Sequence, residues 1–323
     1  MDIIYLGAGL ILLFLGGESL LRGSVAIAEK LNLSTLFVSM VLVGFGTSAP
    51  ELMVSVAAAT KGAPNIALGN VIGSNIANIL LILGLSAAFM PIICRRHEMM
   101  RDMLAVLISS IVLTGLALNG SISQITGLLM LISLISYISY AYITQRSNTV
   151  KDTIHRERLE ADTGVSSLSF HVAAALCIVG FLSLASGAHF LVEGAASIAA
   201  RFGISKAVIG LTIVAVGTSL PELATAVVSA IRRHADVVIG NVIGSNLFNI
   251  LGVLGATAAV SPIPFSGRLA EVDIWIMLIV AVGLAPMIWA GRRIGRIDGI
   301  IFVSLYGMYT IWTYLVSAPS TIP

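Results

Sequence analysis

The sequence contains few charged residues. Only 11% of its 323 residues are charged and 57% are hydrophobic, whereas soluble domains carry about 25% charged residues. A soluble core of this size could not hide so much apolar surface, so we expect lipid to be the solvent of the chain. The net charge is +2 and no basic stripe with interleaved aromatic residues is present, which argues against nucleic acid as a partner.

Cysteine and histidine are also scarce. The two cysteines, Cys94 and Cys177, lie far apart and outside any cluster with metal-ligand spacing, so we expect one cytoplasmic-side thiol and one small buried residue. The five histidines lie near the ends of apolar runs or in loops. The apolar runs also lack Ser/Lys, paired-Asp and His-x-x-x-His arrangements. We therefore expect neither an intramembrane enzyme nor a prosthetic group.

Apolar runs of about 18 to 25 residues, long enough to cross about 30 Å of hydrocarbon, recur along the chain. The first run follows Met1 and Asp2 without a basic region, so we interpret it as a retained helix rather than a signal peptide. The charged segment 144–167 is expected to be a solvated cytoplasmic linker between the halves 1–143 and 168–323. The predicted spans are 3–21, 34–60, 66–90, 103–119, 124–143, 168–191, 205–231, 237–260, 273–290 and 298–317.

The basic residues predict the orientation of these spans. When the ten spans alternate in direction, 14 of the 18 Lys and Arg residues fall on one side and 4 on the other. The positive-inside rule then places both termini outside the cytoplasm. The short loops, and the lack of a separate soluble domain, favour a minimal prokaryotic plasma-membrane protein that works as a monomer.

An internal repeat organises the chain. At an offset of 171 residues, Val43–Leu52 aligns with Val214–Leu223 and Gly69–Asn75 aligns with Gly240–Asn246. Over 43–80 and 214–251, 19 of 38 positions are identical without a gap. Each half holds five predicted spans, so the second half must enter the bilayer upside down. Inverted repeats are typical of secondary transporters, although a channel could have them too, so the repeat alone indicates transport.

Two glutamates occupy equivalent positions within the repeat. Glu51 and Glu222 each lie in an apolar run, one residue after a proline. Proline interrupts a helix and frees carbonyl groups that only protein or a water-filled cavity can satisfy at membrane depth. No Lys or Arg lies at the same depth, so the partner of each buried carboxylate is a bound cation or a proton. The alternative, two neutral glutamic acids that join helices, does not explain why the whole motif is duplicated.

Oxygen donors accompany both glutamates. Residues four apart share a helix face, and this relates Thr47 to Glu51 and Ser74 to Asn78. Ca²⁺ prefers carboxylate, amide, hydroxyl and carbonyl oxygens, whereas softer metals prefer Cys or His. The amides of Asn70, Asn75, Asn241 and Asn246 either support the ligands from behind or join helices to one another. The predicted ligands are Glu51, Thr47, Ser74, Asn78 and the carbonyl of Gly44, with Glu222, Thr218, Ser245, Asn249 and the carbonyl of Ala215 from the second repeat.

These motifs resemble the sodium/calcium exchanger family of the calcium/cation antiporter superfamily. The two G-T-S-x-P-E-L…G-N-V-I-G-S-N segments look like the paired α-repeats of that family, and the similarity extends over essentially the whole chain. The resemblance implies an all-α fold of ten transmembrane helices in two inverted halves. It also implies that the residues named above bind the transported ions, and that Ca²⁺ is exchanged for Na⁺ by alternating access as the first and sixth spans slide.

One position departs from part of the family. Potassium-dependent members have an aspartate where this chain has Asn249, so we expect exchange without K⁺. A Ca²⁺/H⁺ antiporter remains an alternative, because burial favours a protonated carboxylate, and a cation channel is a further one. A site with two carboxylates is neutralised by one Ca²⁺ or two Na⁺. A third Na⁺, which the resemblance implies, would make exchange electrogenic.

Overall fold

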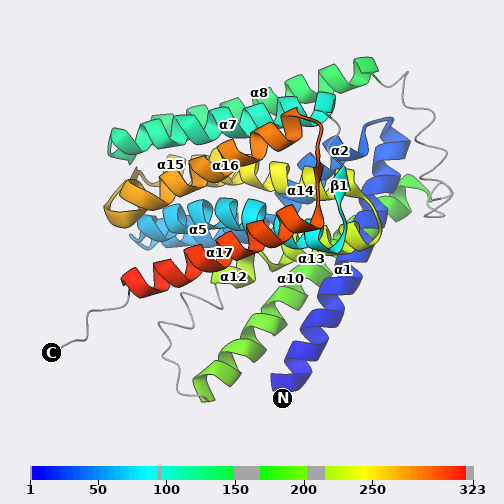
Figure 1. Ribbon diagram of the computed structural model, residues 1–323, viewed down its shortest axis with the longest axis horizontal. Coiled ribbons are helices and arrows are strands. Elements are labelled where there is room, and N and C mark those ends of the chain that lie inside the picture. Colours follow the sequence, from blue (N-terminus) through cyan, green and yellow to red (C-terminus); the bar gives the residue numbers. More distant parts are fainter. Residues whose placement is uncertain (1, 94–95, 149–167, 202–214, 318–323) are drawn as a thin grey trace.

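The computed structural model describes residues 2–93, 96–148, 168–201 and 215–317, and within them the chain is almost entirely helical (Figure 1). Most of the predicted linker, and Cys94, lie outside these residues. The first half contains α1 (Asp2–Leu31), α2 (Thr35–Val38), η1 (Ser39–Gly44), α3 (Phe45–Thr47), α4 (Ala49–Thr60), α5 (Pro64–Ala77), η2 (Asn78–Leu83), α6 (Gly84–Phe89), α7 (Arg96–Leu118) and α8 (Gln124–Asn148). The second half contains α10 (Phe170–Arg201), α12 (Ala215–Thr218), α13 (Leu220–Ile231), α14 (Ala235–Leu247), η6 (Phe248–Val253), α15 (Leu254–Val260), η7 (Leu269–Asp273), α16 (Ile274–Trp289) and α17 (Arg296–Ser317). The η elements are π-helical turns.

Among the residues that the structure describes, seven helices are long and apolar enough to cross a membrane, and eight if the bent pair Thr35–Thr47 and Ala49–Thr60 forms one span. These eight coincide with eight of the ten predicted spans. Of the other two, the predicted span 205–231 lies only partly within the described residues, where it contains the shorter helix α13. The span 298–317 coincides with α17, which is not among the seven. The all-helical membrane fold is confirmed, while the number ten stays a prediction.

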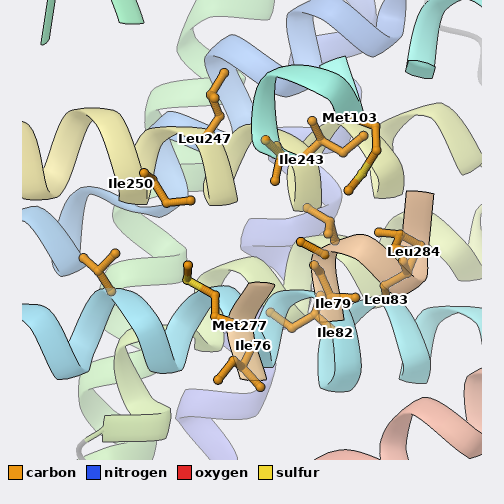
Figure 2. Close-up of a cluster of buried hydrophobic side chains, with 14 of the residues drawn as sticks. Ile76, Ile79, Ile82, Leu83, Met103, Ile243, Leu247, Ile250, Met277 and Leu284 are labelled. Carbon is orange, nitrogen blue, oxygen red and sulfur yellow. The ribbon is translucent and has the colours of Figure 1, made fainter. Parts of the chain in front are cut away.

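The two halves interlock rather than form separate units. Helix α7 packs on α14, whereas α16 packs on α5; similarly, α8 packs on α15 and α17 on α6. The apolar core lies between these helices, and Figure 2 shows Met103 and Met277 from the flanking helices gathered with side chains of α5 and α14. Each half is therefore stabilised largely by apolar surface that the other half supplies.

Short strands also join the halves. Strand β1 (Ile92–Ile93) pairs with β4 (Arg293–Ile294), and β2 (Ser121–Ile122) pairs with β3 (Ile263–Pro264), both antiparallel. Near the β2–β3 pair, the side-chain amide of Asn65 at the start of α5 donates to Ser266 Oγ (3.2 Å). Ser266 lies in the segment that follows α15. Helix α5 therefore begins where α15 ends, so α5 and the continuous rod α14–η6–α15 run in opposite directions (Figure 1).

Helices α1 and α10 form a pair inclined to the remaining helices (Figure 1). Glycines lie at their contact: a Cβ built on Gly16 would be 3.0 Å from the carbonyl of Gly180, and one on Gly9 would be 2.9 Å from that of Gly187. Small residues let two backbones approach this closely, and the resulting van der Waals packing favours association of helices in lipid. The pair also packs on α13, which carries one of the two predicted acids.

Candidate ion-binding site

Both glutamates lie just after a break in a helix. Helix α3 ends at Thr47 and α4 begins at Ala49, with a bend of 42° between the two flanking helical stretches. In the second repeat, α12 ends at Thr218 and α13 begins at Leu220. The prolines therefore occupy the first turn of α4 and α13, where a missing backbone donor costs nothing. The predicted interruptions are confirmed, and the positive end of each helix dipole lies near a carboxylate.

The carboxylates of Glu51 and Glu222 are buried, with exposed fractions of 0% and 2%. The Oε2 atom of each has no hydrogen-bond partner within the described part of the chain. No ion pair with Lys, Arg or His is formed by either glutamate among the described residues. Each repeat thus contributes one carboxylate oxygen that is withdrawn from water and free to bind a cation or a proton.

Two serines each donate a hydrogen bond from one repeat to the glutamate of the other. Ser48 Oγ donates to Glu222 Oε1 (2.9 Å), while Ser219 Oγ donates to Glu51 Oε1 (3.3 Å). Both serines stand at the helix breaks, and neither is among the ligands predicted from the sequence. Their duplication directly after Thr47 and Thr218 was the available signal. Because each carboxylate is held by a hydroxyl of the other repeat, the two breaks are brought together into one site.

Two asparagines hold the backbone at the glutamates. Asn70 Nδ2 donates to the carbonyl of Glu51 (3.3 Å), and Asn241 Nδ2 donates to the carbonyl of Glu222 (3.0 Å). These two contacts are equivalent under the repeat, and they support the interpretation that the asparagines act from behind the ligands. Such supporting hydrogen bonds fix the direction in which a ligand points.

A network of hydrogen bonds lies where η1 meets α14. Thr47 Oγ1 is within hydrogen-bond distance of the carbonyls of Val43 (2.9 Å) and Gly44 (3.3 Å). Ser245 Oγ donates to the same Gly44 carbonyl (3.0 Å). Asn241 Oδ1 accepts from both Thr47 (3.3 Å) and Ser245 (3.4 Å). The carbonyl of Gly44 thus lies within this network and accepts a hydrogen bond from Ser245 of the other repeat.

Ser74 and the end of α12 lie on the opposite side of the site. Ser219 Oγ lies 3.4 Å from Ser74 Oγ, which places Ser74 beside Glu51. Thr218 is the last residue of α12 and Ala215 its first. The break at Ser219 therefore brings the end of α12 to the site, while a contact of Ala215 with an ion stays a prediction.

Asn78 and Asn249 begin or nearly begin the π-helical turns η2 and η6. Both are 1% exposed. Asn78 Nδ2 donates to Asn246 Oδ1 (2.9 Å), whereas Asn78 Oδ1 and both amide atoms of Asn249 have no partner among the described residues. π-Helical turns are frequent at functional sites. The turns η2 and η6 widen their helices at the two predicted amide ligands, Asn78 and Asn249.

The site therefore combines two carboxylates with hydroxyl, amide and carbonyl oxygens. Within the described residues, no group of three or more His, Cys, Asp and Glu side chains could hold a metal. A formal charge of −2 in an oxygen-lined interior suits hard cations of low charge that bind reversibly, rather than a permanently held transition metal.

Comparisons with known proteins agree with this chemistry. The family model described as sodium/calcium exchanger protein matches residues 1–144 and 172–315. The inner membrane protein YrbG of Escherichia coli is 32% identical over 311 residues, which cover 94% of this chain and 93% of the relative. The sodium/calcium exchanger MaX1 of Methanosarcina acetivorans is 28% identical over 353 residues, which cover 96% and 98%. A structure of the sodium-calcium exchanger NCX_Mj superposes with a TM-score of 0.83 at 32% identity and covers 97% of this chain and 98% of that one.

The helical membrane fold and the buried acid pair define an integral membrane cation antiporter. The chain belongs to the sodium/calcium exchanger family.

Proposed function

We propose that this antiporter exchanges Ca²⁺ for Na⁺ at the site around Glu51 and Glu222. The observation that carries the proposal is the pair of buried carboxylates, each with one oxygen held by a serine of the other repeat and one oxygen without a partner among the described residues. An empty site with two ionised carboxylates is costly in a low-dielectric interior. A loaded site is neutral with one Ca²⁺ and close to neutral with Na⁺, so ion binding and movement of the protein are coupled.

The proposed ligands are the ten predicted residues together with Ser48 and Ser219. Their chemistry agrees with the ions named for a relative, since crystals of NCX_Mj were soaked with Na⁺ and Ca²⁺ or with Na⁺ and Sr²⁺. Asn249 contributes a neutral amide, and this supports exchange that is independent of K⁺. A third Na⁺ would leave the site at +1, so the cycle would move net charge.

The opposite directions of α5 and α14–α15 support the inverted arrangement of the repeats. We propose ten spans with both termini outside the cytoplasm, in a monomer that opens alternately to the two sides. The α1–α10 pair, which contacts the remaining helices mainly along α13 and is joined by small residues, is the part proposed to slide.

The test is ⁴⁵Ca²⁺ uptake into proteoliposomes driven by an outward Na⁺ gradient, with the pH gradient collapsed. Glu51→Gln and Glu222→Gln each remove a charge and an acceptor oxygen, and Na⁺-driven uptake is expected to fall to the level of empty liposomes. Glu193→Gln is the matched control, because Glu193 is an exposed glutamate paired with His189 on α10.

Four results would contradict the proposal or a part of it. Normal Na⁺-driven uptake by either site variant would remove the acids from the mechanism. Uptake that follows a pH gradient but not a Na⁺ gradient would identify a Ca²⁺/H⁺ antiporter, in which the unpartnered oxygens carry protons. Uptake without any counter-ion would identify a channel. Rates that do not respond to an imposed membrane potential would count against the third Na⁺.

A further inference from the structure

Four buried asparagines lie where α5–η2 crosses α14–η6. Asn75 and Asn78 belong to the first repeat, and Asn246 and Asn249 are their equivalents in the second. All four are at most 2% exposed. The bond from Asn78 Nδ2 to Asn246 Oδ1 (2.9 Å) joins the two repeats. The equivalent bond from Asn249 Nδ2 to Asn75 Oδ1 is not formed, and both atoms lack a partner among the described residues. The other end of the Asn75 amide, Nδ2, donates to the carbonyl of Val71 (2.7 Å) in its own helix.

The direction of the Asn78 amide decides what it offers to an ion. An amide carries one acceptor oxygen and two N–H donors, which look alike in shape but have opposite polarity. With its nitrogen tied to Asn246, the amide of Asn78 leaves Oδ1 buried and without a partner among the described residues. A turned amide would direct N–H groups, and hence positive charge, toward a cation.

We propose that Asn246 is a positioning residue for the cation site: its side-chain oxygen holds the Asn78 amide with Oδ1 toward the ion. This inference rests on the proposed function, since it assumes that a cation binds beside Asn78. Asn246 itself does not contact the ion, and it acts through the orientation of Asn78. Asn75 has no such role in this structure, although it is the same residue type at the equivalent position.

The measurement is Ca²⁺-dependent thermal stabilisation of the purified full-length protein in detergent, in Na⁺-free choline buffer. Asn246→Ala is expected to raise the Ca²⁺ concentration for half-maximal stabilisation about tenfold or more, the usual effect of losing a group that orients a metal ligand. Asn75→Ala, the matched control, is expected to leave this concentration unchanged. The Tm without Ca²⁺ reports any purely structural cost separately, because a structural loss lowers it without altering the response to Ca²⁺.

A second pair of variants, built on Asn78→Asp, tests the orientation of the side chain at position 78 directly. In Asn78→Asp both terminal atoms are oxygens, so the direction of the side chain no longer matters. Adding Asn246→Ala to this variant is expected to cause no further loss of Ca²⁺ response relative to Asn78→Asp alone, and the added charge is common to both. Where Asn246→Ala does not yield folded protein, Asn246→Asp replaces it, because its carboxylate can still accept from Asn78 and is expected to retain the response.

Several outcomes would overturn the proposal. They are an unchanged Ca²⁺ response in Asn246→Ala, an equal loss in Asn75→Ala, a further loss of the same factor in the Asn78→Asp background, or loss of the response in Asn246→Asp. A parent protein that Ca²⁺ does not stabilise at all would instead contradict the proposed function, so the two failures are distinguishable.

Discussion

The same seven residues, G-N-V-I-G-S-N, occur in both repeats, but the last residue of each copy forms a different bond. Asn246 Oδ1 of the second copy accepts from Asn78 Nδ2 of the other repeat (2.9 Å), whereas Asn75 Nδ2 of the first copy donates to the carbonyl of Val71 in its own helix (2.7 Å). The second copy also packs closely on η1, because a Cβ built on Gly240 would lie 2.7 Å from the carbonyl of Leu36 and one on Gly244 would collide with the carbonyl of Met40.

This difference shows that a local sequence defines the side chains of a surface but not the partners that they find. Two halves of one site can therefore be bonded unequally although their ligands are equivalent. Substitutions at equivalent positions measure this inequality.

The largest effect is expected for Gly244→Ala. A methyl group at position 244 must push the η1 backbone away, and overpacking of this kind typically costs 1–3 kcal/mol or more, so we expect a loss of about 3 kcal/mol. Gly115→Ala on α7 is the control, because Gly115 is exposed and a Cβ built on it meets no described atom within 4 Å; its stability is expected to stay equal or to rise by up to about 1 kcal/mol. Thermal unfolding in detergent without ions measures both. Equal losses would mean that η1 does not pack closely on Gly244.

Next comes the comparison of Asn241→Ala with Asn70→Ala. Removing Asn241 frees the carbonyl of Glu222 (3.0 Å) and removes one of the acceptors near the hydroxyls of Thr47 and Ser245. We expect the Ca²⁺ concentration for half-maximal transport to rise about 10- to 100-fold, and a smaller rise for Asn70→Ala, because its bond to the carbonyl of Glu51 is longer (3.3 Å). Asn65→Ala is the control, because its amide bonds Ser266 at an exposed position. A larger effect at position 70 would reverse the assignment of the stronger half.

A smaller contrast is expected between the crossed serines. Ser48→Ala removes the 2.9 Å bond to Glu222, whereas Ser219→Ala removes a 3.3 Å contact with Glu51 from a hydroxyl that also approaches Ser74. A hydrogen bond to a charged group contributes about 1.5–3 kcal/mol, so Ser48→Ala is expected to weaken ion binding at least tenfold and Ser219→Ala less. Concentration dependence of Na⁺-driven ⁴⁵Ca²⁺ flux gives both values. The contrast fails if Ser219→Ala is the more damaging.

The smallest effect concerns Glu18 and its repeat equivalent, His189. Glu18 forms ion pairs with Arg22 (2.7 Å) and with Arg232 at the end of α13 (2.8 Å), and both arginines are about half exposed. Solvent-exposed ion pairs contribute about 0.2–1 kcal/mol and are screened by salt. Glu18→Gln is therefore expected to lower stability slightly at low salt and not at high salt. His189→Gln should change neither value; a salt-independent loss in Glu18→Gln would indicate a role beyond the ion pairs.

Much of the fold and of the site could be predicted from the sequence. Long apolar runs are nearly sufficient to locate membrane helices, and eight of the ten predicted spans coincide with helices or a bent pair that can cross a membrane. A proline next to an acid within an apolar run predicted both helix breaks. The repeat identified Glu51 and Glu222 as equivalents before any contact between the halves was known.

Other features depended on packing between distant segments. The crossed bonds of Ser48 and Ser219, the ribbons that join the halves, and the single bond between Asn78 and Asn246 all link residues more than 140 positions apart. The π-helical turns have no strong local signal, because their residues also suit an α-helix. The different bonds of Asn75 and Asn246 could not be predicted at all, since the two motifs that contain them have identical sequences.

The crossed serines bear on how such a molecule arose. A half-length ancestor would contain one carboxylate and one serine, but the serine reaches only the carboxylate of a second copy. Such a chain could complete its site only as a dimer, with oppositely inserted copies under the inverted arrangement proposed above. Duplication and fusion of such a half would make that pairing permanent and would leave the two copies free to diverge at positions such as Gly44 and Ala215.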